Sequence, residues 1–180
     1  MKKIQTSRLL FKIVFIGFEG VGRRTLLRGF TSYGFNNGES RYETVGAEFY
    51  SKRYKIEKYE VELFIWNLNS AEDCNFLRPS FYRETSLAVL AFSIINKNSF
   101  IFLNEFLSEI RMFTGNIPIY LVGNMRDLKE FRKVSRETAK KFVKNNNLID
   151  YIEISAKNGL NCEEIFENIA RLLYESHKNS

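Results

Sequence analysis

The sequence predicts one three-layer α/β domain over residues 1–180, with helices on both faces of a doubly wound, mostly parallel sheet. Strand-like and helix-like segments alternate along the chain with short breaks between them. Two apolar runs, Leu87–Phe92 and Ile117–Val122, are nearly continuous, as expected of strands that are buried on both faces. With 44% hydrophobic residues and seventeen phenylalanines, 180 residues suffice for a single core.

Six strands are expected, and one pair of them departs from the parallel arrangement. A short polar turn separates the segments 47–56 and 60–67, which predicts an antiparallel hairpin. The fold class is therefore a six-stranded, mostly parallel sheet with one antiparallel edge strand. The expected strands are Leu10–Ile16, Ala47–Ile56, Glu60–Asn67, Leu87–Ile94, Ile117–Val122 and Tyr151–Ile154.

Two of the helices have clear start signals. Asn161, with Glu164 three residues later, predicts a capped start for the last helix, and Ser135 predicts the same for an earlier helix. A helix over Ser99–Phe113 carries a core stripe and surplus apolar residues, which form either a broad core contact or a partner surface. These surplus residues are Ile101, Phe102, Phe106 and Phe113.

Charge and cysteine content narrow the class of protein. The net charge is +6, and the Lys and Arg residues are scattered among acidic neighbours, which predicts a solubilising surface and not a nucleic-acid-binding one. Cys74 and Cys162 have no metal-ligand or disulfide spacing, which favours the cytoplasm, and the near-terminal His177 is given no role. The chain as given shows no membrane span, signal peptide or lipidation site, so membrane contact is expected only through a partner or a missing tail.

A glycine-rich loop follows the first predicted strand. Gly17-Phe-Glu-Gly-Val-Gly22-Arg-Arg-Thr25 has the glycine spacing of a phosphate-binding P-loop. In that motif a lysine and then a serine or threonine follow the last glycine, because the lysine meets the β- and γ-phosphates and the hydroxyl ligates Mg²⁺. Arg23 and Arg24 occupy these two positions. The sequence thus keeps the glycine scaffold and changes the residues that perform its chemistry.

Further motifs in the same order resemble those of Ras-like small GTPases, especially the Rab branch. The family has Trp-Asp-Thr-Ala-Gly-Gln-Glu, Tyr-Tyr-Arg and Gly-Asn-Lys-x-Asp-Leu at three of these places. The resemblance covers nearly the whole chain and implies the P-loop NTPase fold of a small G domain. The corresponding segments here are Thr44-Val-Gly-Ala-Glu-Phe49, Trp66-Asn-Leu-Asn-Ser-Ala-Glu72, Phe81-Tyr-Arg83, Gly123-Asn-Met-Arg-Asp-Leu128 and Ser155-Ala-Lys157.

The resemblance implies a largely intact guanine pocket for GTP or GDP. Asp127 would accept hydrogen bonds from N1–H and the 2-amino group of guanine, which adenine cannot offer. Asn124 would tie the loops together, the Ala156 amide would donate to O6, and Met125 replaces the usual lysine. The implied nucleotide-binding residues are Gly17, Glu19, Gly20, Val21, Gly22, Arg23, Arg24, Thr25, Phe35, Thr44, Asn124, Met125, Asp127, Ser155, Ala156 and Lys157.

The metal and phosphate end departs from the family pattern. Arg24 removes a Mg²⁺ ligand, and Asn67 stands where the family has the aspartate that holds Mg²⁺ through water, which leaves Thr44 as a candidate ligand. Two interpretations remain open. Either Arg24 takes over part of the metal's charge, so that binding depends weakly on Mg²⁺, or Arg24 points to solvent or pairs with Glu19.

The residues expected to support hydrolysis are also replaced. Ala71 replaces the glutamine that in this family orients the attacking water, and Ser70 replaces the glycine whose amide contacts the γ-phosphate. Glu19 adds a negative charge beside the γ-phosphate position. Arg23 and Arg24 either offset this charge or are satisfied by Glu19 in an empty site, which would favour GDP or no nucleotide over GTP. We therefore expect no catalytic residue and slow or absent hydrolysis.

Two classes of function follow from the resemblance. The first is a monomeric, guanine-nucleotide-binding regulator in signalling or vesicle trafficking, controlled by an exchange factor and presenting Phe49, Trp66 and Phe81 to effectors. The same three aromatic residues also suit a small core at the sheet edge. The second class is a nucleotide-independent pseudo-GTPase interaction module. The guanine loops favour the first class, whereas the altered P-loop and second switch favour the second. An unrelated P-loop kinase is disfavoured, because it would not need guanine-selecting loops.

Overall fold

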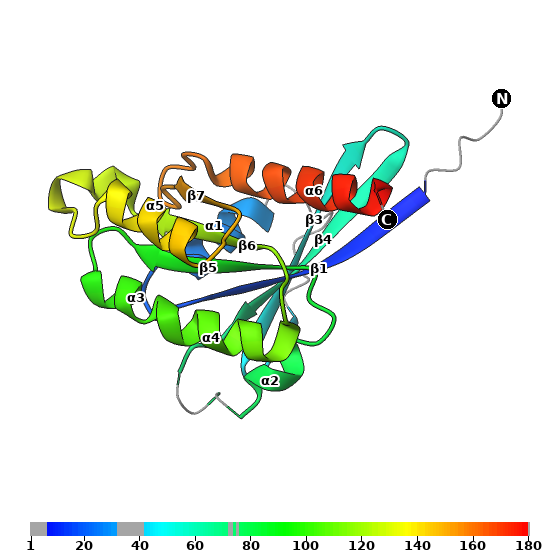
Figure 1. Cartoon of the computed structure of the whole chain (residues 1–180). Coiled ribbons are helices and arrows are strands. Elements are labelled where there is room, and N and C mark those ends of the chain that lie inside the picture. The colour runs from blue at the N-terminus through cyan, green and yellow to red at the C-terminus, as the bar shows by residue number, and fades with distance from the viewer. Residues whose placement is uncertain (1–6, 32–41, 72–73, 75, 180) are drawn as a thin grey trace.

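The computed structural model describes residues 7–31, 42–71, 74 and 76–179. Within these residues, seven strands form one sheet in the order β2-β3-β4-β1-β5-β6-β7, with helices on both faces (Figure 1). The strands are β1 (Ser7–Gly17), β2 (Tyr42–Thr44), β3 (Ala47–Ile56), β4 (Tyr59–Leu68), β5 (Leu87–Ser93), β6 (Ile119–Asn124) and β7 (Asp150–Glu153). The helices are α1 (Arg23–Thr31), α2 (Arg78–Phe81), α3 (Lys97–Ile101), α4 (Leu103–Thr114), the 3₁₀ helix η2 (Arg126–Phe131), α5 (Arg136–Asn145) and α6 (Cys162–Lys178).

The pairing of the strands confirms the predicted fold class. Strands β4, β1, β5, β6 and β7 run parallel, and β3 pairs antiparallel with β4 as expected of the hairpin. The six expected strands begin and end within three residues of the observed ones. The prediction lacked β2, which pairs antiparallel with the start of β3 and is the outermost described strand on that side. Three residues are too few to show a strand periodicity.

Among the described residues, two cores lie on the two faces of the sheet. Successive side chains of a strand point to opposite faces, so in β1 Ile13 and Phe15 join one core while Val14 and Ile16 join the other. Helices α1 and α6 cover the first core. Helices α3, α4 and α5 cover the second. The sheet is therefore held rigidly between two apolar layers, and the loops at its ends are free to build a site.

The helix starts confirm one of the two predicted caps. The Ser135 hydroxyl accepts a hydrogen bond from the Thr138 amide at 3.1 Å and caps α5 as predicted. The predicted Asn161 cap of α6 is wrong, because Asn161 has a left-handed φ of +57° and its side chain donates instead to the Glu153 carbonyl at 2.8 Å. No helix in the described part of the chain is both long enough and apolar enough to cross a bilayer.

The segment predicted as one helix over Ser99–Phe113 is divided between α3 and α4, and most of its surplus apolar residues make packing contacts. Phe106 is buried in the second core. Phe102 packs on Phe18 with ring centroids 4.8 Å apart, and Phe113 stacks on Tyr82 at 6.0 Å. Ile101 alone of the four is more than half exposed, at 54%. The broad core contact is thus the better interpretation for this helix pair.

A buried carboxylate fastens α5 to the sheet. Glu153, at the end of β7, accepts two hydrogen bonds from Arg132 at 2.7 and 2.9 Å, one from Arg136 at 3.0 Å and one from the Tyr151 hydroxyl at 2.8 Å. Burial by itself raises the pKa of this carboxyl. The four donated hydrogen bonds and the two guanidinium charges outweigh burial and lower the pKa of Glu153 from 4.5 to about 2.

Because the pKa of Glu153 is lower in the folded chain, its stabilisation is complete above about pH 5 and is lost as the pH falls from 4.5 toward 2. We predict that Glu153→Gln lowers the free energy of unfolding by about 3 kcal/mol at pH 7, and that the difference from wild type shrinks toward pH 3. Urea unfolding at several pH values measures this. The exposed Glu137→Gln is the control, and a difference that stays constant with pH would contradict the role of Glu153.

Candidate functional site

The glycine-rich loop joins the end of β1 to the start of α1. Gly17 packs so closely on β5 that an added Cβ would lie 2.1 Å from the Ala91 carbonyl oxygen. Gly20 and Gly22 have φ values of +75° and +86°, which L side chains rarely adopt. The loop leads into α1, whose first amides have no carbonyl partner within the helix and carry the positive end of its dipole. This geometry suits an anion.

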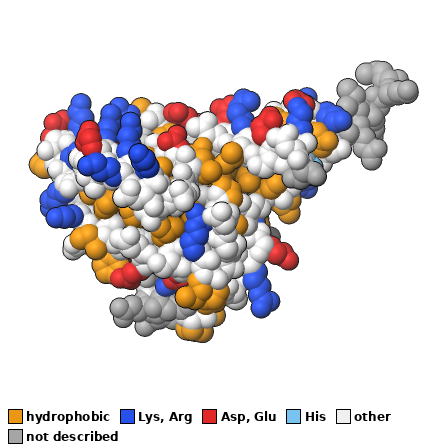
Figure 2. Space-filling model, in the orientation of Figure 1, with side chains coloured by type: hydrophobic (Ala, Val, Ile, Leu, Met, Phe, Trp, Pro, Cys, Tyr) orange, Lys and Arg blue, Asp and Glu red, His pale blue; other side chains and the backbone are white. Residues whose placement is uncertain are grey.

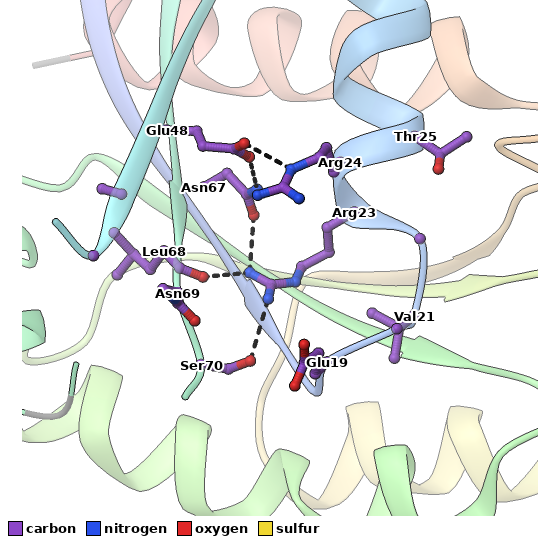
Figure 3. A pocket seen from close by; sticks show the side chains of 14 residues that line it. Glu19, Val21, Arg23, Arg24, Thr25, Glu48, Asn67, Leu68, Asn69 and Ser70 are labelled. Atoms are coloured by element: carbon purple, nitrogen blue, oxygen red, sulfur yellow. Dashed lines mark hydrogen bonds and ion pairs between the residues drawn. The ribbon is translucent and has the colours of Figure 1, made fainter. Parts of the chain in front are cut away.

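A cavity of about 530 Å³ lies over this loop (Figure 3). Three segments line it: the glycine-rich loop with the start of α1, the chain around the start of β3, and the chain around the end of β4. Thr25 turns away from Glu48 and Asn67 in Figure 3, so its hydroxyl does not replace the one lost at position 24. The lining residues are Glu19, Gly20, Val21, Gly22, Arg23, Arg24, Thr25, Gly46, Ala47, Glu48, Asn67, Leu68, Asn69 and Ser70.

Arg23 is a cation held by neutral partners. Its guanidinium donates to the Asn67 side-chain oxygen at 2.8 Å, to the Leu68 carbonyl and to the Ser70 hydroxyl at 3.3 Å. No carboxylate of the described residues lies within ion-pair distance of it. Burial lowers the pKa of Arg23 to about 10, so the side chain still carries its charge at neutral pH. The cavity wall therefore holds a positive charge that no direct contact neutralises.

Arg24 forms an ion pair with a carboxylate that the sequence analysis did not single out. Its Nε lies 2.7 Å from Glu48 Oε1, and the Glu48 side chain is only 9% exposed. The expected pairing of Arg24 with Glu19 is wrong, because the partner is Glu48. The expected exposure to solvent is found in part, since the Arg24 side chain is 61% exposed. The strand register offered a signal, because Glu48 is directly opposite Asn67 in the β3–β4 hairpin.

Both oxygens of Glu48 are occupied. Asn67 donates to Oε2 at 2.8 Å and the Tyr50 hydroxyl donates to the same oxygen at 3.1 Å. Burial raises the pKa of Glu48, but the hydrogen bonds from Asn67 and Arg24 and the charge of Arg24 outweigh it, so the pKa lies below its ordinary value. Glu48 is thus a buried anion neutralised by Arg24.

These contacts do not fit Mg²⁺, which requires an octahedron of oxygen ligands. Position 24 carries a cation, the Asn67 oxygen accepts from Arg23, and Glu48 is already paired. The described residues contain no group of three or more His, Cys, Asp or Glu side chains that could hold a metal ion. Thr44, the remaining candidate ligand, belongs to β2 but its side chain lies outside the described residues, as does Phe35.

At the other end of the site, Asn124 joins three loops. Its buried side chain donates to the Val21 carbonyl at 2.8 Å and accepts from the amides of Ala156 at 3.0 Å and Met125 at 2.7 Å. Gly22 permits this, since a Cβ there would lie 2.4 Å from the Asn124 amide nitrogen. The predicted tie between the glycine-rich loop and the two base loops is present. The Ala156 amide, expected to donate to guanine O6, donates to Asn124 in this structure.

Asp127 lies beside this junction with one oxygen engaged. The Ser155 hydroxyl donates to Asp127 Oδ1 at 2.6 Å, and Oδ2 has no hydrogen-bond partner among the described residues. The Met125 sulfur accepts from the Ser93 hydroxyl at 3.0 Å, so this side chain is tied to the end of β5. Lys157 is exposed. The predicted base residues thus meet where β6 and β7 end, as ligand sites do in parallel sheets.

A second arginine, Arg78, holds the segment after β4 from the opposite side. Its buried guanidinium forms two hydrogen bonds with Glu109 of α4, at 2.8 and 2.9 Å. It also donates to the carbonyls of Asn69 at 3.5 Å and Ala71 at 3.4 Å. The segment Asn69–Ala71 therefore accepts hydrogen bonds from both Arg23 and Arg78. Sequence reasoning missed Arg78, because its partner is 31 positions away.

The three aromatic residues expected at the partner surface do meet. Trp66 contacts Phe49 edge-on at 4.7 Å between centroids and Phe81 at 5.7 Å, and Phe64 completes the cluster. The Lys12 ammonium lies 3.7 Å above the Trp66 ring. Phe64 and Lys12 were missed, although Phe64 is two positions before Trp66 and so shares its face of β4. We call these five residues the aromatic cluster.

We predict that Asn124→Ala lowers the free energy of unfolding by about 2 to 3 kcal/mol, because the Val21 carbonyl and Ala156 amide lose their buried partner. Hydrogen exchange should accelerate in the glycine-rich loop and near Ala156 more than in the sheet. The exposed Asn168→Ala on α6 is the control. Equal exchange in the two variants would show that Asn124 does not join the loops.

Comparison with known proteins agrees with the family resemblance of the sequence motifs. The model of the Ras family matches residues 12–175 of this chain. Among similar proteins are the Ras-related protein Rab-30 of Homo sapiens, of Bos taurus and of Mus musculus. Each is 38% identical over 173 residues, which cover 95% of this chain and 84% of the relative.

Proposed function

The chain belongs to the Ras family of small GTPases, and from this premise we propose that it is a guanine-nucleotide-binding regulator that balances phosphate charge with arginine instead of Mg²⁺. One observation carries the proposal. Arg24, Glu48 and Asn67 form a closed set of contacts at the position of the family's metal ligands, while the guanine loops are joined through Asn124.

Recognition of guanine rests on Asp127. Ser155 fixes one carboxylate oxygen and leaves the other without a described partner. A carboxylate held in this way accepts from the two adjacent N–H groups of guanine, and adenine presents no such pair. GTP and GDP are therefore the proposed ligands.

Binding of phosphate is proposed to fall to Arg23. Its present acceptors are an amide oxygen, a carbonyl and a hydroxyl, all neutral. A phosphate oxygen offers a charge-assisted hydrogen bond, which is about twice as strong as a neutral one. Glu19 also lines the cavity and opposes further negative charge, so we propose a preference for GDP over GTP.

Hydrolysis is proposed to be slow. Ala71 has no polar side-chain atom with which to hold a water, and Arg23 and Arg78 fix the segment around it. Catalysis of phosphoryl transfer depends on positioning the water and on donors aimed at the transferring group. An arginine supplied by a partner protein would therefore accelerate hydrolysis little, because the glutamine that orients the attacking water is replaced by Ala71.

Effectors and an exchange factor are the proposed partners, and the aromatic cluster is the proposed effector surface. Aromatic side chains are favoured anchors in interfaces. Trp66 directly precedes Asn67, which Arg23 contacts. If phosphate draws Arg23 away, the change begins one residue from the centre of the cluster. This adjacency supports a partner surface that responds to nucleotide.

A nucleotide-independent interaction module remains the second candidate function. It is favoured by the contacts that both arginines make within the protein, since Arg23 donates to three neutral acceptors and Arg24 pairs with Glu48. The titration below separates the two candidates, because this module would bind no guanine nucleotide under either condition.

We predict that GDP binds with affinities that agree within about threefold in excess Mg²⁺ and in EDTA, as measured by calorimetry on nucleotide-free protein. The double variant Arg24→Ser with Asn67→Asp restores a hydroxyl and a carboxylate, and its affinity should become at least tenfold dependent on Mg²⁺. Arg24→Ser alone is the matched control. A tenfold loss for the wild type on chelation would contradict the proposal.

We further predict a single-turnover rate of GTP hydrolysis below about 10⁻⁴ s⁻¹, under the intrinsic rate of a competent small GTPase. Ala71→Gln should raise this rate less than threefold, because Arg23 and Arg78 still hold the segment in place. Phosphate release from preloaded protein gives both rates. A wild-type rate above the stated limit would contradict the loss of turnover.

A further inference from the structure

The positive charge of the chain is concentrated at one end of the molecule, and the expectation of scattered charge is wrong in this respect. Residues 126–144 contain eight Lys or Arg and three Asp or Glu, so this segment alone carries a formal charge of +5 of the chain's +6. Figure 2 shows these basic side chains gathered over the end of the molecule where η2 and α5 lie in Figure 1. The segment is continuous in the sequence, so counting charges over this stretch alone already reveals the excess.

Five lysines in this segment are unpaired as far as the described part of the chain shows. Arg132 and Arg136 are bound to Glu153, as described above. The lysines, in contrast, are all exposed, and none makes a hydrogen bond or ion pair through its side chain with a described residue. On α5, residues 140 and 144 are one helical turn apart and project from the same face. The five are Lys129, Lys133, Lys140, Lys141 and Lys144.

Two exposed apolar side chains are near the lysines in the sequence, one before α5 and one after it. Phe131, at the end of η2, is 67% exposed, and Ile149, which follows α5, is 44% exposed. We call the five lysines with Phe131 and Ile149 the basic face. Aromatic and aliphatic side chains that are exposed to water gain no hydrophobic free energy of burial. Both kinds of residue are accommodated where polar headgroups meet acyl chains.

We propose that the basic face docks the domain onto an anionic lipid bilayer. Of the six cations of the segment whose side chains make no hydrogen bond or ion pair with a described residue, five are lysines and the sixth is Arg126. Lysines act as point charges and suit the diffuse charge of a membrane surface, whereas arginine suits bidentate recognition of single groups. Phe131 and Ile149 would enter the headgroup boundary, and the phosphate backbone of a nucleic acid offers them no comparable contact. The partner is therefore a bilayer that contains acidic phospholipid.

The position of the basic face leaves the aromatic cluster accessible. Helix α5 packs beside β7, at one end of the strand order, while Phe49 and Trp66 lie on β3 and β4 near the other end. A domain that rests on α5 therefore presents its aromatic cluster away from the membrane contact. Membrane docking and partner binding are compatible in this orientation.

The test is co-sedimentation of the whole chain with vesicles of phosphatidylcholine alone or with 30% phosphatidylserine. Each lysine near an anionic surface contributes about a fivefold increase in binding. We expect wild type to bind the phosphatidylserine vesicles, to dissociate in 0.5 M NaCl, and to lose roughly 100-fold in partition coefficient on combining Lys140→Gln, Lys141→Gln and Lys144→Gln. A second variant, Phe131→Trp, should show a blue-shifted emission on these vesicles only.

The matched control combines Lys55→Gln, Lys58→Gln and Lys97→Gln, which removes the same charge from exposed lysines outside the segment. Its binding should fall less than fivefold. Emission of the native Trp66 and far-ultraviolet circular dichroism confirm that the variants are folded. Equal losses in the two triple variants, or equal binding to neutral vesicles, would overturn the proposal.

Discussion

The ion pair between Arg24 and Glu48 is the contact on which the architecture of the site depends. It joins the first turn of α1 to the start of β3, and Asn67 extends it by donating to Glu48 and accepting from Arg23. Arg23 in turn reaches the segment after β4. One continuous chain of contacts thus links the phosphate loop, the hairpin and the segment beside the aromatic cluster.

The unusual residues of this chain depend on one another. An aspartate at position 67 could not donate to Glu48, and two carboxylates in contact would repel each other in a poorly solvated place. Asparagine has both a donor and an acceptor, so it satisfies Glu48 and Arg23 together. A small hydroxyl at position 24 would leave the buried Glu48 carboxylate without its cation. The substitutions therefore behave as a set.

Much of the fold and part of the site could be predicted from sequence, for identifiable reasons. Long apolar runs such as Leu87–Phe92 mark buried strands, and motif residues at the ends of adjacent parallel strands meet at one edge, as Asn124 and Ala156 do. The partner of Arg24 was not predicted, although the hairpin register places Glu48 opposite Asn67, because the position of α1 against β3 was needed as well. The contact between Arg78 and Glu109 depends on the placement of α4, which sequence pattern does not give. Asn161 does not cap α6, because its side chain donates to the Glu153 carbonyl, eight positions earlier in the chain. A pattern that compares residues three or four positions apart does not detect this contact.

We propose that arginine, and not a divalent cation, neutralises the nucleotide phosphates. Phosphorus NMR of the protein with bound GDP, titrated with paramagnetic Mn²⁺, tests this most directly, because Mn²⁺ broadens the resonance of any phosphate that it ligates. If arginine has this role, the α- and β-phosphate resonances of the bound nucleotide stay sharp at one equivalent of Mn²⁺. Broadening of the β-phosphate resonance at stoichiometric Mn²⁺ would contradict it.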